Sequence, residues 1–113
     1  GSHFDVTILG MGLDGHTASL FPYADGLETA ISDTTNPLAA ITAKKSDATG
    51  EYTERLSLSL AGILRSKVIY LLISGEEKLS MYIKARLSNN QYKYPVAAVL
   101  QQTQVPVHVY WAP

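Results

Sequence analysis

The 113-residue sequence contains no cysteine. This absence excludes disulfide bonds and fits a protein of a reducing compartment, so we expect a cytoplasmic location. An excess of charge of one sign is also missing, because nine basic residues stand against ten acidic ones and leave a net charge of −1. Such a balance provides neither the basic footprint of a nucleic-acid binder nor a polybasic surface for lipid. The sequence therefore predicts no nucleic-acid partner and no membrane partner.

Long apolar runs are absent as well. The longest run, residues 68–73, is far shorter than the ~20 residues that a membrane-spanning helix needs. The apolar share of 46% is nevertheless that of a globular protein, and 113 residues suffice for one modest core but not for two. Residues 1–3 look like the remnant of a cleaved tag, which leaves residues 4–113 as one domain.

The segment richest in chemistry is Gly-Met-Gly-Leu-Asp-Gly-His-Thr-Ala-Ser-Leu-Phe-Pro at residues 10–22, directly after an apolar run at 4–9. Three of its residues permit positive φ angles and a close approach of the backbone to a ligand, namely Gly10, Gly12 and Gly15. Residues 17–21 are expected to begin a helix whose unpaired N–H groups attract an anion. His16 lies in the middle of the loop, where polar groups of a site usually stand at the carboxyl edge of a parallel sheet.

Two other interpretations of this loop are open. The Gly-x-Gly-x-x-Gly spacing is formally that of a dinucleotide-binding fingerprint, which needs a helix starting inside the glycine run and an acidic residue about 20 positions on, at the end of the next strand. Here Phe21-Pro22 ends the turn early, and the acidic residues that follow have no strand pattern around them. The plainer alternative is a surface turn in which Asp14 caps the next helix and His16 is solvated. Residue chemistry favours the functional interpretation over both.

Hydrophobic periodicity predicts the elements around the loop. Short apolar or alternating runs predict strands at residues 4–9, 38–43, 55–60, 68–73 and 105–111. Short helices are predicted at 61–65 and 95–101, an irregular connection at 23–36 and a mobile loop at 44–54.

One longer helix is predicted after the strand at 68–73. Ser74 can cap it while Glu77 reaches back, which is the capping-box arrangement. Apolar residues at four-residue spacing then form a stripe that is expected to face the sheet: Leu79, Ile83 and Leu87.

The alternation of strands and helices predicts an α/β fold with a mainly parallel, Rossmann-like sheet flanked by helices. The run at 4–9 is almost wholly apolar, which is typical of a strand buried on both faces. Since nothing native precedes this strand, we expect the sheet to be incomplete, and an exposed apolar edge to favour self-association.

With these segments in view, the chain resembles the 6-phosphogluconolactonases, in the larger family that includes glucosamine-6-phosphate deaminase. The resemblance covers residues 4–111 and is most specific in the loop. The deaminases share its Gly-x-Asp-Gly-His core, whereas Thr-Ala-Ser-Leu-Phe-Pro at 17–22 is the lactonase continuation. Weaker landmarks in the expected order are Gly-Glu-Glu-Lys at 75–78 and Arg-Leu-Ser at 55–57.

The resemblance implies the fold shared by glucosamine-6-phosphate deaminase, ribose-5-phosphate isomerase and CoA transferases. It also implies hydrolysis of 6-phosphoglucono-δ-lactone to 6-phosphogluconate in the pentose phosphate pathway. Residues 4–113 then form the C-terminal portion of a lactonase domain, because the family's upstream phosphate loop and Asp-Glu-Arg segment do not occur here. The expected partners are the phosphosugar lactone and the missing N-terminal half of the same enzyme, so the chain alone is expected to have low or no activity.

Lactone hydrolysis needs an activated water, a stabilised oxyanion and a grip on the phosphate. An imidazole ordinarily titrates near neutral pH, so His16 suits the general base, a role that the resemblance also implies. Asp14 either orients this imidazole or holds the water, and a turn-capping role is equally open. Backbone N–H groups at 12–15 are candidate oxyanion donors. Substrate binding is assigned to Gly10, Gly12, Gly15 and Thr17.

Two basic residues complete the candidate site. Lys78 lies in the first turn of its helix and by the resemblance contacts phosphate, although a lysine on such a helix is more often solvated. Arg55 is placed to clamp phosphate or a substrate hydroxyl, with pairing to Glu51 or Glu54 as the alternative.

No cofactor and no metal is expected, because His16, Asp14 and His108 show no ligand spacing. Two other functions stay open. One is a glucosamine-6-phosphate deaminase or isomerase, against which the continuation at 17–22 argues. The other is a non-catalytic module that binds a sugar phosphate.

Overall fold

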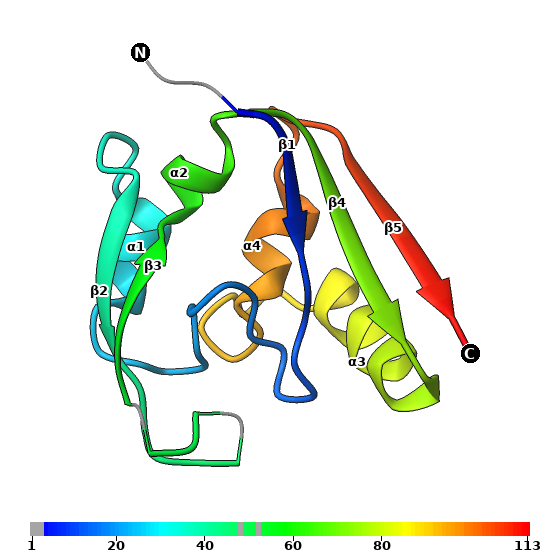
Figure 1. Ribbon diagram of the computed structural model, residues 1–113, viewed down its shortest axis with the longest axis horizontal. Helices are drawn as coiled ribbons and strands as arrows, with labels where there is room; N and C mark the ends of the chain where they lie inside the picture. The colour runs from blue at the N-terminus through cyan, green and yellow to red at the C-terminus, as the bar shows by residue number, and fades with distance from the viewer. Residues whose placement is uncertain (1–3, 48, 52) are drawn as a thin grey trace.

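A parallel three-stranded sheet organises the molecule (Figure 1). It has the order β1-β4-β5 and consists of β1 (Phe4–Leu9), β4 (Ser66–Ser74) and β5 (Val107–Ala112). The computed structural model describes residues 4–47, 49–51 and 53–113, so the expectation for residues 1–3 lies outside it. The strands predicted at 4–9, 68–73 and 105–111 and their parallel arrangement are confirmed, with the most apolar run in the central strand β4.

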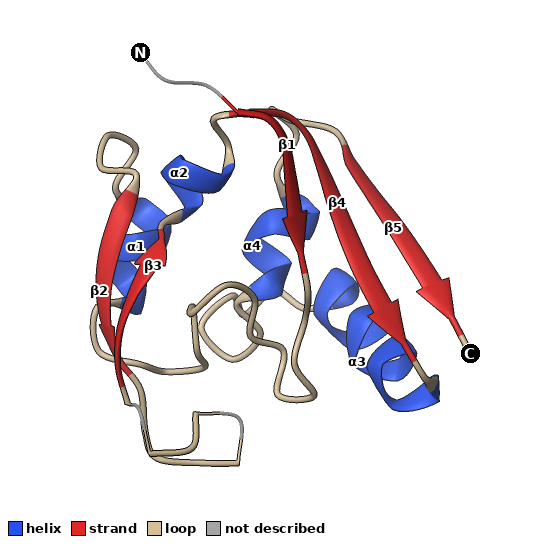
Figure 2. Ribbon diagram, viewed as in Figure 1, coloured by secondary structure: helices blue, strands red, loops and turns tan. Residues whose placement is uncertain are grey.

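Helices cover one face of this sheet (Figure 2). They are α3 (Glu76–Leu87) and α4 (Val96–Gln101), the second of which confirms the helix predicted at 95–101. Ile69 and Leu71 of β4 join Ala85 of α3 and Val99 of α4 in one buried apolar cluster. One part of the core therefore lies between β4 and the two helices.

The opposite face of the sheet is apolar but exposed. Five large side chains on it have exposed fractions between 43% and 66%, and we call this set the bare face: Phe4, Val6, Ile8, Leu72 and Tyr110. Side chains alternate between the faces of a strand, and β1 is an edge strand that pairs with β4 alone among the described strands. The prediction that the strand at 4–9 is buried on both faces is therefore wrong for this chain.

A smaller antiparallel sheet lies beside the main one (Figure 1). It pairs β2 (Leu38–Thr42) with β3 (Glu54–Leu58), and it packs against α1 (Leu27–Ser32) and α2 (Leu60–Ile63). The two strands and the short helix were predicted within one or two residues. The loop predicted at 44–54 forms the connection between β2 and β3; residues 48 and 52 lie outside the described part of the chain.

Helix α1 replaces the irregular connection predicted at 23–36. Only Leu27 and Ala30 of the helix are buried, which is too short a stripe for a period to show in the sequence. Gly26 begins the helix with φ 89°, and a Cβ there would lie 2.2 Å from the carbonyl oxygen of Ala40. Packing against β2 therefore decides where this helix begins.

Helix α3 begins differently from the prediction. Ser74 is the last residue of β4, and Gly75, with φ 85° and no side-chain cap, precedes the first helical residue. The capping box of Ser74 and Glu77 does not form, because the parallel pairing with β5 extends as far as Ser74.

The face that α3 presents to the core also differs from the prediction. Ile83 and Leu87 are exposed, whereas Ala85 is fully buried and Met81 and Tyr82 pack against the core. The small side chain of Ala85 lets α4 approach closely, and this outweighs the regular leucine and isoleucine spacing.

Candidate functional site

The loop after β1 is held by hydrogen bonds within its own backbone. The N–H of Gly12 donates to the carbonyl of His16 at 2.9 Å, and the N–H of Gly15 donates to the carbonyl of Gly12 at 3.0 Å. Gly15 has φ 88°, so glycine is needed there. The hydroxyl of Thr17 is fully buried and donates to the carbonyl of Gly10 at 2.7 Å. Gly10 and Thr17 thus shape the loop from within.

The segment 17–21 is a turn and not the predicted start of a helix. The N–H of Leu20 donates to the carbonyl of Thr17 at 2.9 Å, and Ala18 has φ 50°, a left-handed conformation that interrupts a helix. The expectation of an anion-binding helix start directly after His16 is therefore wrong.

His16 and Asp14 form a close pair. The Nδ1 atom of His16 lies 2.5 Å from Oδ1 of Asp14, and the same oxygen accepts the backbone N–H of His16 at 3.0 Å. A carboxylate oxygen accepts, so the contact is a hydrogen bond when the ring proton is on Nδ1, and in that neutral tautomer Nε2 is the nitrogen free to accept a proton. The two side chains are 22% and 33% exposed, within reach of solvent.

Two further residues border the imidazole. A Cβ on Gly12 would lie 2.2 Å from both Cε1 and Nδ1 of His16, so the ring occupies the space that only glycine leaves open. The ring of Phe21 contacts the imidazole with centroids 4.5 Å apart and an interplanar angle of 31°. The imidazole of His16 is therefore contacted by a carboxylate and an aromatic ring, in a space that a glycine leaves open.

The predicted oxyanion donors are only partly available. The N–H groups of Gly12, Gly15 and His16 are already used within the loop. Among the described residues, no acceptor is recorded for the N–H groups of Leu13 and Asp14. These two are the donors that the loop leaves for a developing negative charge.

A cleft of about 600 Å³ opens beside the pair. It lies at the edge where β1 and β4 end, which is also where α3 begins (Figure 1). Seven residues line it: Gly12, Leu13, Asp14, His16, Ser46, Asp47 and Lys78. The structure thus brings Lys78, half-buried in the first turn of α3, to the same cleft as His16.

Sequence reasoning missed Ser46 and Asp47 as cleft residues. They lie in the connection between β2 and β3, and they reach the cleft only through the packing of the smaller sheet. The polar composition of residues 44–54 was visible in the sequence, but nothing in it indicated which other element this loop approaches.

Arg55 does not line the cleft. Its guanidinium carbon lies over the ring of Phe21, 5.4 Å from the centroid, and its Nη2 donates to the carbonyl of Thr49 at 2.9 Å. Glu51, one of the alternative partners considered for Arg55, pairs instead with Lys45 at 3.0 Å. Arg55 is therefore connected to His16 through Phe21.

His108 does not line this cleft. It is exposed on β5 and stacks on Tyr70 with centroids 5.5 Å apart. Among the described residues no three histidine or acidic side chains are grouped so that they could hold a metal ion. In the same part of the chain, no helix has the length and apolar character needed to cross a bilayer.

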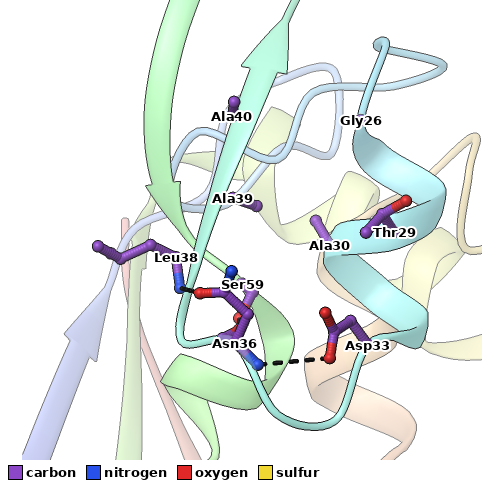
Figure 3. Close-up of a pocket in the computed structure, with 9 residues that line it drawn as sticks. All are labelled: Gly26, Thr29, Ala30, Asp33, Asn36, Leu38, Ala39, Ala40 and Ser59. Carbon is purple, nitrogen blue, oxygen red and sulfur yellow. Dashed lines mark hydrogen bonds between the residues drawn. The ribbon is translucent and has the colours of Figure 1, made fainter.

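A second cavity of about 300 Å³ lies between α1, β2 and α2 (Figure 3). Its polar side chains are engaged locally. Asp33 accepts the N–H and hydroxyl of Thr35, both at 2.8 Å, and these bonds, the backbone one first, lower the pKa of its carboxyl group below 3.8. Ser59 donates to the carbonyl of Asn36 at 2.5 Å and accepts the N–H of Gly62 at 3.1 Å. This cavity offers capping groups and no candidate for acid–base chemistry.

Comparison with known proteins agrees with this geometry. Residues 1–111 match the family described as glucosamine-6-phosphate isomerases/6-phosphogluconolactonase. A 6-phosphogluconolactonase of Rhizobium meliloti is 36% identical over 113 residues, which is 100% of this chain and 47% of the relative.

Solved structures give the same result. A 6-phosphogluconolactonase from Shewanella baltica is 41% identical, with a TM-score of 0.85 over 97% of this chain and 45% of that one. A structure from Neisseria gonorrhoeae described as a putative 6-phosphogluconolactonase is 37% identical, with a TM-score of 0.84 over 100% of this chain and 47% of that one. The fold is thus that of these enzymes, and the chain spans a little under half of their length.

Proposed function

Because the chain belongs to the family of glucosamine-6-phosphate isomerases and 6-phosphogluconolactonases, we propose that it supplies the acid–base part of a 6-phosphogluconolactonase. The reaction is the hydrolysis of 6-phosphoglucono-δ-lactone to 6-phosphogluconate. The observation that carries the proposal is the contact of 2.5 Å between Nδ1 of His16 and Asp14, in a cleft that also holds Lys78.

In the proposed reaction, Nε2 of His16 accepts a proton from a water molecule as the water oxygen bonds to the lactone carbonyl carbon. Asp14 keeps Nδ1 protonated and stabilises the imidazolium that forms. The carbonyl oxygen becomes an oxyanion, for which the N–H groups of Leu13 and Asp14 are the available donors. Collapse of this intermediate breaks the bond to the ring oxygen, and the imidazolium returns the proton to that oxygen.

Lys78 is proposed as the phosphate contact. Its ammonium group stands in the first turn of α3, where the N-terminal end of the helix also favours an anion. A phosphate held there would place the sugar ring across the cleft toward His16. Arg55 is not assigned to phosphate in this scheme, because it lies over the ring of Phe21 and does not line the cleft that holds His16 and Lys78.

The proposed partner is the remainder of the enzyme. The relatives named above are more than twice as long as their match to this chain, and the bare face of the sheet is a parallel-sheet surface of the kind that other elements normally cover. We propose that further polypeptide of the enzyme packs on this face. That the chain is the C-terminal portion of the enzyme stays a prediction, as does its cytoplasmic location.

The experiment uses the full-length enzyme that carries this segment, assayed with freshly prepared lactone. We expect His16→Ala to lower kcat by about 100-fold or more, because it removes the general base. Lys78→Gln is expected to raise KM for the phosphorylated lactone with a smaller change in kcat. Lys84→Gln is the matched control, since Lys84 is exposed on the same helix as Lys78 and does not line the cleft, and its kinetics should equal those of the wild type.

Three outcomes would contradict the proposal. One is release of acid by the full-length enzyme no faster than by spontaneous hydrolysis. Another is release of ammonia from glucosamine 6-phosphate, which would assign the deaminase function. A third is calorimetric binding of 6-phosphogluconate without turnover, which would indicate a binding module.

A further inference from the structure

We propose that Phe21 is a positioning residue for His16, and that Arg55 influences the reaction through Phe21 and not by contact with substrate. The inference rests on the proposed function for its kinetic consequence. Its structural content, the orientation of one imidazole, stands without it.

Phe21 is the residue that connects the two side chains. Its ring is 4% exposed and contacts the imidazole of His16 at a centroid distance of 4.5 Å. The guanidinium of Arg55 lies over the same ring at 5.4 Å. One buried aromatic side chain therefore touches both the general base and the cation that the sequence suggested as a phosphate clamp.

The imidazole needs the contact with Phe21 because the hydrogen bond to Asp14 restrains only one edge of the ring. Asp14 holds only Nδ1, and that carboxylate is 33% exposed, so water competes for it. Gly12 leaves room for the ring and does not hold it in place. The ring of Phe21 is the surface that opposes rotation of the imidazole about its Cβ–Cγ bond, since a rotated ring would lose this contact.

Arg55 is in turn held by the connection between β2 and β3. Its Nη2 donates to the carbonyl of Thr49, a buried residue whose hydroxyl accepts the N–H of Ser46 at 2.8 Å and donates to the carbonyl of Lys44 at 3.0 Å. Phe21, Ser46 and Thr49 also share the lining of a hollow of about 190 Å³ next to the cleft. The contact of Arg55 with Phe21 therefore connects the segment that carries Ser46, which lines the cleft, to the imidazole of His16.

This arrangement predicts a different effect from that of a phosphate clamp. A residue that grips phosphate in both ground state and transition state changes KM, whereas a residue that orients the base changes kcat. Arg55 does not line the cleft that holds His16 and Lys78, which favours an effect on kcat over an effect on KM.

The first test is nuclear magnetic resonance of the 113-residue chain labelled with 15N-histidine. The sequence has three histidines, so His3, His16 and His108 can be assigned by single substitution. The ring nitrogen shifts report which nitrogen carries the proton. We expect His16 in the wild type to be mainly the Nδ1–H tautomer, and Phe21→Leu to shift it toward a mixture with the Nε2–H form. Arg55→Gln should cause a smaller shift in the same direction, and Arg55→Lys should restore part of it.

The matched control is Arg86→Gln. Arg86 also lies over an aromatic ring, that of Tyr82 at 5.7 Å, but on α3. This variant should leave the tautomer of His16 unchanged. Amide spectra check that each variant is folded; if Phe21→Leu unfolds the chain, the two Arg55 variants carry the test, because Arg55 is only half-buried.

The second test measures kinetics in the full-length enzyme. Arg55→Gln is expected to lower kcat about tenfold and Phe21→Leu by about 10- to 100-fold, each with KM within twofold of the wild type. An unchanged tautomer in folded variants, or a rise in KM at constant kcat for Arg55→Gln, overturns the inference. If the enzyme lacks lactonase activity but the tautomer shifts as expected, the proposed function fails and the positioning of His16 by Phe21 stands.

Discussion

The imidazole of His16 lies against the backbone of Gly12. The sequence showed three glycines at a dinucleotide-like spacing, and their common interpretation was freedom of the backbone. In the structure, glycine is needed at two of these positions for different reasons. Gly15 has a positive φ, whereas a side chain on Gly12 would collide with the imidazole of His16. The reason for a glycine is thus specific to its position.

We predict that Gly12→Ala disables the site without unfolding the protein. The new Cβ would lie 2.2 Å from two atoms of the imidazole, so the ring must move away from Asp14. The full-length enzyme should lose about 10- to 100-fold in kcat, measured with fresh lactone, while its circular dichroism spectrum is retained. Gly10→Ala should have a smaller effect, because no atom lies within 4 Å of a Cβ there. Equal activity of Gly12→Ala and the wild type would show that His16 is not held against this glycine.

The residues of the cleft differ in how far the sequence revealed them. His16 and Asp14 share a tight turn, so their proximity follows from local spacing. Lys78 could be placed near them because the carboxyl ends of parallel strands meet at one edge. The position of Arg55 over Phe21 could not be predicted, since it depends on how the smaller sheet packs against the loop.

At the scale of elements, the strands were predictable and the faces of the helices were not. A strand produces a short apolar or alternating run of residues in the sequence, regardless of which element it packs against. Helix α3 buries Ala85 and exposes Leu87, which is the reverse of what hydrophobicity predicts. In β3, Ser57 is buried and Leu56 is exposed, because the Ser57 hydroxyl accepts the N–H of Ser19 at 3.0 Å and donates to the carbonyl of Leu58. Hydrogen bonding and close packing thus outweigh the apolar pattern.

The connection from α1 to β2 predicts an acid-sensitive contribution to stability. Hydrogen bonds from Thr35 and Asn36 lower the pKa of the Asp33 carboxyl group in the folded chain. A folded-state pKa below the unfolded one stabilises the fold at pH values above the ordinary value of 3.8, and this stabilisation is lost as the pH falls through the lowered pKa.

Asp33→Asn should therefore reduce the loss of stability that the chain shows on acidification. The measurement is the urea midpoint of the wild type and the variant from about pH 5 down to about pH 2. The difference between the two proteins should be largest at the upper end of this range and shrink toward the lower end. A constant difference across the range would mean that the carboxylate contributes no pH-dependent stability.

At the scale of the whole molecule, the residues that the structure describes cover the main sheet on one side only (Figure 2). Parallel sheets are normally buried on both faces, and the bare face carries aromatic and branched apolar side chains of three neighbouring strands. An exposed apolar patch of this kind favours association. The chain spans 47% of its Rhizobium meliloti relative, which agrees with a sheet whose second cover is supplied elsewhere.

We predict that the 113-residue chain self-associates through the bare face. Leu72→Lys combined with Ile8→Lys should shift the chain toward the monomer in analytical ultracentrifugation, because two lysines on neighbouring strands repel a second copy. Leu56→Lys is the matched control. Leu56 is 72% exposed on the smaller sheet, so its substitution should leave the distribution unchanged. A wild-type chain that stays monomeric at all concentrations would contradict the prediction.

The sequence by itself determined the strands, the helices other than α1, the α/β class with its parallel main sheet, and the loop in which His16 and Asp14 meet. These features depend on local periodicity, on the conformational freedom of glycine and on spacing of a few residues. Only the tertiary structure decided which face of the sheet is bare, which side of α3 is buried, and that Phe21 stands between His16 and Arg55. Those outcomes depend on contacts between residues far apart in the chain, where shape and hydrogen bonding select among faces that the apolar pattern alone leaves equivalent.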